Sequence, residues 1–144
     1  MAPTLDSAFL VSALGDSLRE RCGPPRTFGR AVIDSRLTRA GDLFVALRGP
    51  NFDGHDFVAD SFARGAAAAV VHAAPNGVAI DVPLVVVRDT MDALNGLGAW
   101  ARKSSAARVV AITGSVGKTG TKEALKLVLA RQAPTSAGVG SLNN

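Results

Sequence analysis

The sequence contains few aromatic residues and only one cysteine. Tyrosine is absent, Trp100 is the only tryptophan, and Cys22 is the only cysteine among 144 residues. A single cysteine cannot form a disulfide within the chain, which is typical of proteins in a reducing compartment. We therefore expect a cytoplasmic protein.

Long apolar runs are also absent. The longest stretches, such as residues 84–87 and 109–112, are far shorter than the ~18 apolar residues that suggest a membrane span. Residues 1–4 place no basic segment ahead of an apolar one, so we predict neither a signal peptide nor a membrane partner. A hydrophobic content of 47% is ordinary for a chain that buries a core.

Acidic residues are scarce near the end of the chain. Residues 101–144 carry seven basic residues against one acid, Glu123, whereas residues 1–72 carry eight of each. A local positive excess attracts ligands that carry phosphate. Binding of single-stranded nucleic acid would need several aromatic residues for stacking, and Trp100 is the only one nearby. We therefore expect a small phosphorylated ligand, no nucleic acid, and a missing acidic remainder.

Helical and strand patterns alternate along the chain. Apolar periodicity and turn residues predict helices at residues 4–18, 55–64, 90–103 and 118–131. The same signals predict strands at residues 31–33, 42–47, 67–72, 84–87 and 109–112. We expect Thr4 and Thr90 to be N-caps and Gly65 to end its helix in a left-handed conformation. This order predicts an α/β fold with a largely parallel sheet in its second part and a domain boundary near Arg88 and Asp89.

The most specific motif is a strand, a glycine-rich turn and a helix start. Residues 109–119 read Val-Val-Ala-Ile-Thr-Gly-Ser-Val-Gly-Lys-Thr. In such a turn the backbone N–H groups converge on phosphate oxygens, and Gly114 and Gly117 allow torsions that a side chain would block. Lys118 would meet the β- and γ-phosphates, and the Thr119 hydroxyl would ligate Mg²⁺. The general pattern has a glycine where this chain has Ile112, so an ordinary turn with a chance Gly-Lys-Thr is the alternative.

The motif defines the first group of candidate site residues. We predict that Lys118 is catalytic and that Thr119 is also a metal ligand. The predicted ATP phosphate-binding residues are Thr113, Gly114, Ser115, Val116, Gly117, Lys118, Thr119 and Gly120.

Three stretches together resemble one enzyme family. Residues 113–119 are similar to the ATP-binding loop of the Mur ligases, which add amino acids or dipeptides to a UDP-linked muramoyl peptide. Residues 34–36, 41–49 and 53–57 resemble the UDP-binding N-terminal domain of this family. Ser115-Val116, Thr121-Lys122-Glu123 and Leu142-Asn143-Asn144 look most like the branch that adds D-alanyl-D-alanine.

The resemblance implies a fold and an activity. It implies a small UDP-substrate-binding α/β domain at residues 1–88, followed at residues 89–144 by the first strand–P-loop–helix unit of a truncated parallel-sheet ATP-binding domain. The whole enzyme would use ATP and Mg²⁺ to phosphorylate a carboxylate of UDP-N-acetylmuramoyl-tripeptide, so that the amine of D-alanyl-D-alanine attacks the acyl phosphate in peptidoglycan synthesis. A whole ligase of this family is much longer and monomeric, so we expect this chain to be inactive alone.

The resemblance also implies a second site, for the UDP-linked substrate. Its candidate residues are Ser35, Arg36, Arg48, Gly49, His55, Asn143 and Asn144. Ser35 and Arg36 could hold diphosphate oxygens, although an ordinary turn with a solvated arginine is an equal alternative for Arg36. Arg48 and Gly49 end an apolar strand, where α/β sheets present ligands. His55 could bind a ligand or simply begin a helix that Asp53 caps.

Other residues fit structural roles better. We interpret His72 and Trp100 as packing residues, and Lys122 and Lys126 as part of a solvated helix face. Gly120 stands where the family commonly has Thr or Ser, which removes one hydroxyl near the phosphates.

Three other functions stay open. The chain could be a stand-alone UDP-sugar-binding module without catalysis, or it could come from a Mur ligase that adds a single amino acid. A small P-loop kinase is disfavoured, because Glu123 is the only acid after Asp92.

Overall fold

The computed structural model describes residues 4, 6–74 and 82–138 of the chain. These residues form two compact units, Met1–Ser105 and Ala106–Asn144, which are treated separately below. In the part of the chain that the structure describes, no helix is both long and apolar enough to cross a membrane.

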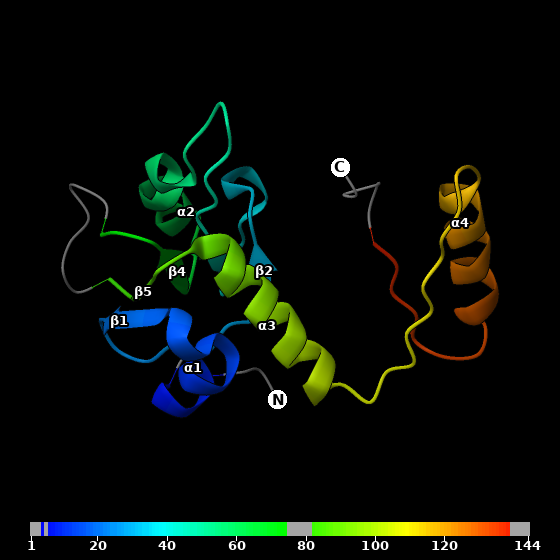
Figure 1. Cartoon of the computed structure of the whole chain (residues 1–144), viewed down its shortest axis with the longest axis horizontal. Helices are drawn as coiled ribbons and strands as arrows, with labels where there is room; N and C mark the ends of the chain where they lie inside the picture. The colour runs from blue at the N-terminus through cyan, green and yellow to red at the C-terminus, as the bar shows by residue number, and fades with distance from the viewer. Residues whose placement is uncertain (1–3, 5, 75–81, 139–144) are drawn as a thin grey trace. The chain divides into compact units, whose positions relative to one another are not determined.

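The first unit contains a five-stranded sheet (Figure 1). Its strands are β1 Leu18–Cys22, β2 Ala31–Val32, β3 Leu43–Val45, β4 Ala68–Val71 and β5 Leu84–Val87. Their order across the sheet is β1-β5-β4-β3-β2, in which β2 to β5 are parallel and β1 pairs antiparallel with β5. The α/β class is confirmed, and the parallel sheet lies in the first unit rather than in the second part of the chain.

Helices cover both faces of this sheet. One face carries α1, Ser7–Leu14, and α3, Thr90–Ser104, whereas the other carries α2, Val58–Ala63. Short 3-10 helices at Gly15–Ser17 (η1), Ser35–Leu37 (η2) and Gly54–Phe57 (η3) complete the connections. The parallel strands β3, β4 and β5 therefore run between two apolar layers, which explains why residues 68–71 and 84–85 read as continuous buried runs.

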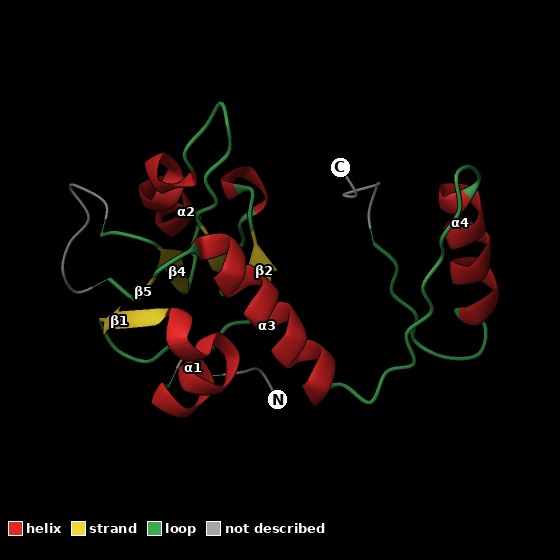
Figure 2. Ribbon diagram, viewed as in Figure 1, coloured by secondary structure: helices red, strands yellow, loops and turns green. Residues whose placement is uncertain are grey.

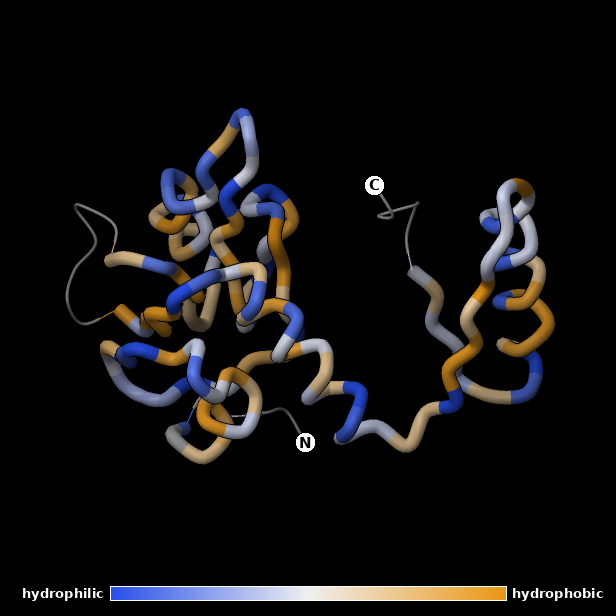
Figure 3. The backbone as a smooth tube through the Cα atoms, viewed as in Figure 1, coloured by the Kyte–Doolittle hydropathy of each residue, from blue (hydrophilic) through white to orange (hydrophobic). Residues whose placement is uncertain are grey.

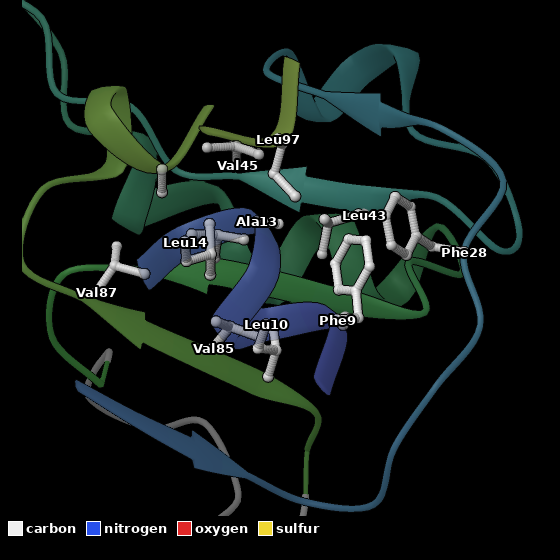
Figure 4. Close-up of a cluster of buried hydrophobic side chains, with 13 residues drawn as sticks. Phe9, Leu10, Ala13, Leu14, Phe28, Leu43, Val45, Val85, Val87 and Leu97 are labelled. Carbon is white, nitrogen blue, oxygen red and sulfur yellow. The ribbon is translucent and has the colours of Figure 1, made fainter. Parts of the chain in front are cut away.

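Strand residues alternate between two apolar clusters. Leu43 and Val45 face α1 and α3, whereas Phe44 and Ala46 face α2. Figure 4 shows the first cluster, in which Phe9 and Leu10 of α1 meet the sheet. Burying one large aliphatic or aromatic side chain contributes about 1.5–3 kcal/mol, so these layers hold the sheet in place.

The first helix is shorter than the sequence predicts. Its N-cap is Asp6, whose carboxylate accepts the Phe9 N–H at 2.8 Å, and not Thr4. The helix ends at Leu14 because Gly15 adopts φ 50°, outside the helical region. Residues 18–22 then form β1, which the predicted helix 4–18 overlaps at residue 18. The three charged residues of β1 give no apolar strand pattern in the sequence.

The compact unit extends beyond the boundary expected near Arg88 and Asp89. Asp89 is the N-cap of α3, accepting the N–H groups of Met91 and Asp92 at 2.8 and 2.9 Å, so the predicted cap at Thr90 is wrong. Ala93 and Leu97 of α3 are buried in the first core cluster, and Trp100 packs edge-on against Phe9 with ring centroids 4.7 Å apart. The structural division therefore follows α3, between Ser105 and Ala106.

The second unit contains α4, Lys118–Leu129, as its only helix among the residues described. Residues 109–112 are not a strand, and Figure 2 shows a loop leading into α4. An apolar β-branched run becomes a strand only when a neighbour pairs with it, and the described residues of this unit provide none. Figure 3 shows hydrophobic residues in this loop and along α4; Val109, Val110 and Leu127 are all more than 60% exposed.

Candidate functional site

The turn before α4 contains two glycines with positive φ. Gly114 has φ 149° and Gly117 has φ 79°, a left-handed conformation that favours glycine. Gly117 is the N-cap of α4, and no side chain caps the helix. The first N–H groups of a helix have no partners within the helix, so this end presents donors and partial positive charge.

Lys118 folds back over this turn. Its ammonium donates a hydrogen bond to the carbonyl of Gly114, and its side chain is half-buried. Thr119 follows in the first turn of α4 and is exposed, as are Thr113, Ser115, Val116 and Gly120. The turn thus gathers a cation, a hydroxyl and exposed backbone at one helix end.

Lys122 and Lys126 differ in their surroundings. The Lys122 ammonium donates to the Gly138 carbonyl at 2.6 Å and lies 3.3 Å from a carboxylate oxygen of Glu123, so this side chain is not simply solvated. Lys126, one turn further along α4, is exposed as expected.

A second group of polar residues lies where β3 and β4 end. Arg48 follows β3 and His72 follows β4, while Asp53 and His55 come from the connection into α2. Arg48 Nε donates to Asp53 Oδ2 at 2.9 Å, and an Arg48 terminal nitrogen lies 2.9 Å from His72 Nε2. His55 Nδ1 lies 2.6 Å from Asp53 Oδ1, and the His72 backbone N–H donates to His55 Nε2 at 3.0 Å. We call these four residues the Arg48 cluster.

Hydrogen bonding fixes the protonation state of His55. A backbone N–H can only donate, so His55 Nε2 is an acceptor and the ring proton lies on Nδ1, facing Asp53. The backbone and ring N–H groups of His55, with help from Arg48, hold the pKa of Asp53 well below its usual range. Asp53 also caps η3, so its predicted structural role coexists with its contacts in the cluster.

The other candidates for the UDP site lie elsewhere or bond to other partners. Arg36 forms a two-pronged pair with Asp34 at 2.9 and 2.7 Å and is 82% exposed. Ser35 is buried, at 6% exposure. The Gly49 N–H donates to the Phe52 carbonyl at 2.9 Å within the loop that follows Arg48.

The remaining candidates, Asn143 and Asn144, lie outside the described residues.

Sequence reasoning missed one buried charge and one site residue. Asp42, at 4% exposure, accepts the Arg30 guanidinium at 2.8–3.1 Å and the Arg39 N–H at 2.8 Å, which closes the loop before β3. His72, interpreted as a packing residue, contacts both Arg48 and His55. Its position at the carboxyl end of a buried strand was the available signal.

Metal-binding clusters are absent from the part of the chain described here: no group of three or more His, Cys, Asp or Glu residues could hold an ion. Thr119 is therefore a single candidate ligand within the described residues.

Comparison with known proteins identifies the family. The profile of the Mur ligase family, catalytic domain, matches residues 31–102, half of the chain. The UDP-N-acetylmuramoyl-tripeptide--D-alanyl-D-alanine ligase of Escherichia coli K12 is 42% identical over 135 residues, which cover 93% of this chain and 29% of that ligase.

Solved structures agree with this match. A crystal structure of MurF from Acinetobacter baumannii superposes with a TM-score of 0.72 at 37% identity, over 92% of this chain and 29% of that one. MurF ligase from Thermotoga maritima in complex with ADP gives a TM-score of 0.57 at 37% identity, over 72% of this chain and 23% of that one. This chain therefore spans less than a third of these relatives, and it belongs to the Mur ligase family.

Proposed function

We propose that this chain is the N-terminal part of an ATP-dependent ligase that adds D-alanyl-D-alanine to UDP-N-acetylmuramoyl-tripeptide in peptidoglycan synthesis. The observation that carries the proposal is the turn from Gly114 to Gly117 with Lys118 folded over it, in a chain 42% identical to a ligase named for this reaction. The chain spans 29% of that relative.

The turn suits the phosphates of ATP. Two glycines with positive φ leave room for close approach, and no side-chain cap blocks the first N–H groups of α4. When ATP binds, the Lys118 ammonium would leave the Gly114 carbonyl and bond to phosphate oxygens, because hydrogen bonds between two charged groups are stronger. A relative solved in complex with ADP supports the use of a nucleotide.

Mg²⁺ is the second implied group. The exposed Thr119 hydroxyl would supply one oxygen ligand, which is the donor type that Mg²⁺ prefers. When bound, the ion would neutralise phosphate charge during transfer.

The UDP-linked substrate fits the first unit. Arg48 and His55 both bond to Asp53 and His72 near the carboxyl ends of β3 and β4, where open α/β sheets bind their ligands. Arg36 and Gly49 would add contacts from neighbouring loops. Under this proposal, ligands of the enzyme are small molecules, and the intact ligase acts as a monomer in the cytoplasm.

Substitution of Lys118 tests the proposal. In the complete ligase, Lys118→Ala removes the cation that faces the transferred phosphoryl group, so we expect turnover to fall about 10²-fold or more. The matched control is Lys126→Ala, which removes the same charge about two turns along α4 and should leave turnover nearly unchanged, since an exposed charge acts only through screened attraction.

Lys122→Ala completes the series. It should cost little turnover, but it also breaks the contact with Gly138, so Lys126 is the cleaner comparison. Turnover and ATP dependence would be measured for all three variants at low and moderate ionic strength. Equal losses at Lys118 and Lys126 would mean that the motif is only a structural turn.

A further inference from the structure

The Arg48 guanidinium is held from two sides although its side chain is 63% exposed. Asp53 binds Nε at 2.9 Å, and His72 Nε2 binds a terminal nitrogen at 2.9 Å. An exposed arginine side chain normally samples many rotamers. Here two hydrogen-bond partners restrict the Arg48 side chain, at a cost in conformational entropy. Two of its five N–H donors are engaged in these contacts.

His72 must act as a hydrogen-bond acceptor in this arrangement. A guanidinium has no acceptor and stays charged, so His72 Nε2 carries the lone pair and the ring proton lies on Nδ1. The backbone of His72 is fixed in turn by His55, which is fixed by Asp53, which also binds Arg48. The four residues therefore form a closed cycle of contacts, and the two imidazole rings pack edge-on at 4.0 Å.

We propose that His72 is a positioning residue that holds Arg48 ready to bind the diphosphate of a uridine nucleotide, an inference that rests on the proposed function. The remaining N–H donors of Arg48 are available beyond the ends of β3 and β4, and a guanidinium binds phosphate oxygens in a two-pronged geometry. Holding the side chain in advance lowers the entropy lost when the anion binds.

Burial, and after it the positive charge of Arg48, lowers the pKa of His72 below its ordinary 6.5. The other titratable groups near this ring are His55, Asp53 and Asp89. A protonated ring could no longer accept from Arg48. The contact is therefore present at neutral pH and lost when the pH falls through the lowered pKa.

Two substitutions of His72 separate positioning from packing. His72→Gln keeps an acceptor near the position of Nε2, whereas His72→Leu keeps bulk without an acceptor. Binding of uridine 5′-diphosphate to the 144-residue chain would be measured by calorimetry at pH 7.5. We expect roughly three- to tenfold weaker binding for His72→Leu, near wild-type binding for His72→Gln, and a larger loss for Arg48→Ala. Arg19→Ala, at an exposed site on β1, controls for the loss of one positive charge.

A second measurement does not depend on the ligand. Nitrogen-15 NMR of the imidazoles reports which ring nitrogen of His72 carries the proton, and we expect Nδ1 at pH 7.5. The Arg48 Nε–H signal should be protected in the wild type and in His72→Gln, and should exchange faster in His72→Leu.

The outcomes separate the inference from the proposed function. Wild-type binding that His72→Leu leaves unchanged would overturn the positioning role while the nucleotide site stands. No wild-type binding of the nucleotide would count against the UDP site itself. In that case a proton on His72 Nε2, or an Arg48 signal that is indifferent to His72, would overturn the positioning role as well, and the opposite result would support it.

Discussion

Asp42 is the most deeply buried acidic residue among those described, at 4% exposure. Its carboxylate receives the Arg30 guanidinium and the Arg39 N–H, and the same guanidinium also donates to the Leu37 carbonyl at 2.8 Å. One buried charge thus fixes both ends of the loop between η2 and β3. Its donors come from Arg30, which precedes β2, and from Arg39 of the loop, so we interpret this buried charge as structural.

Asp42→Asn tests this structural role. The amide keeps the shape but loses the charge, so we expect the free energy of unfolding at pH 7 to fall by about 1–3 kcal/mol. Asp16→Asn, at an exposed site, should change it little. Urea denaturation of the three proteins would measure both effects, and equal stability of all three would contradict a structural role for the charge.

The pH dependence of this effect has a definite sign. The hydrogen bonds from Arg30 lower the pKa of Asp42, so the ion pair stabilises the fold above the unfolded value of about 4 and this stabilisation is lost as the pH falls through the folded value. The difference in unfolding free energy between wild type and Asp42→Asn should therefore narrow as the pH falls from about 4 through the folded-state pKa of Asp42. If this difference in unfolding free energy stays constant as the pH falls, the effect of the substitution comes from packing and not from the charge.

At the scale of elements, α1 and α3 approach closely at one glycine. A Cβ built on Gly96 would lie 2.3 Å from the backbone carbonyl oxygen of Ala13, whereas a Cβ on Gly98, in the same helix, would meet nothing within 4 Å. The contact at Gly96 involves backbone on the opposite side, which cannot rotate away as a side chain can. The spacing of the two helices over the sheet therefore depends on this residue.

The pair Gly96→Ala and Gly98→Ala isolates that contact. Both substitutions raise helix propensity by the same amount, about 0.5–1 kcal/mol. We expect Gly98→Ala to stabilise the protein by this amount and Gly96→Ala to destabilise it by about 1–3 kcal/mol, because the helices must separate. Thermal and urea unfolding would give both values, and stabilisation by Gly96→Ala would show that the helices adjust freely.

Elements buried on two sides were predictable from the sequence, and elements set by distant contacts were not. Residues 84–87 form β5 as predicted, because a short apolar run between turn residues has few alternatives. Residues 109–112 have the same pattern, but no strand pairs with them in the described part of the chain. The strand β1 was missed because Leu-Arg-Glu-Arg-Cys resembles no buried strand. The left-handed conformation predicted for Gly65 is confirmed at φ 96°.

The site shows the same division. The turn around Gly114 and Gly117 is local, so its torsions and the position of Lys118 could be predicted from adjacent residues. The Arg48 cluster joins residues up to 24 positions apart, and only the parallel pairing of β3 with β4 brings Arg48 to His72. The contribution of Ser35 and Arg36 to a UDP site stays a prediction.

At the scale of the whole molecule, the position of α3 decides what can fold alone. The sequence predicts that residues 1–88 form a self-contained domain, but α3 covers one face of their sheet with Ala93, Leu97 and Trp100. Without α3 that face would be open to water, a loss of several kcal/mol in a unit whose total stability is about 5–15 kcal/mol.

Two shortened chains test this division. We expect residues 1–105 to unfold in one cooperative transition and residues 1–88 to melt at much lower temperature or without cooperativity. Calorimetry and near-ultraviolet circular dichroism would compare them, with the 144-residue chain as reference. If both shortened chains unfold with equal cooperativity, the domain boundary lies near Arg88, as the sequence predicts.

The pairing of β1 with β5 has a consequence for synthesis. Leu18 is opposite Val87, about seventy residues later in the chain, and among the described residues β5 is the only strand that pairs with β1. Ribosomes add about 5–20 residues per second, so β1 leaves the ribosome roughly 3–14 s before its partner exists. During this interval its exposed edge carries Arg19, Glu20 and Arg21, and charges of this kind discourage strands from pairing with other chains. The charged residues that make β1 hard to predict thus disfavour aggregation of the nascent chain until β5 has been synthesised.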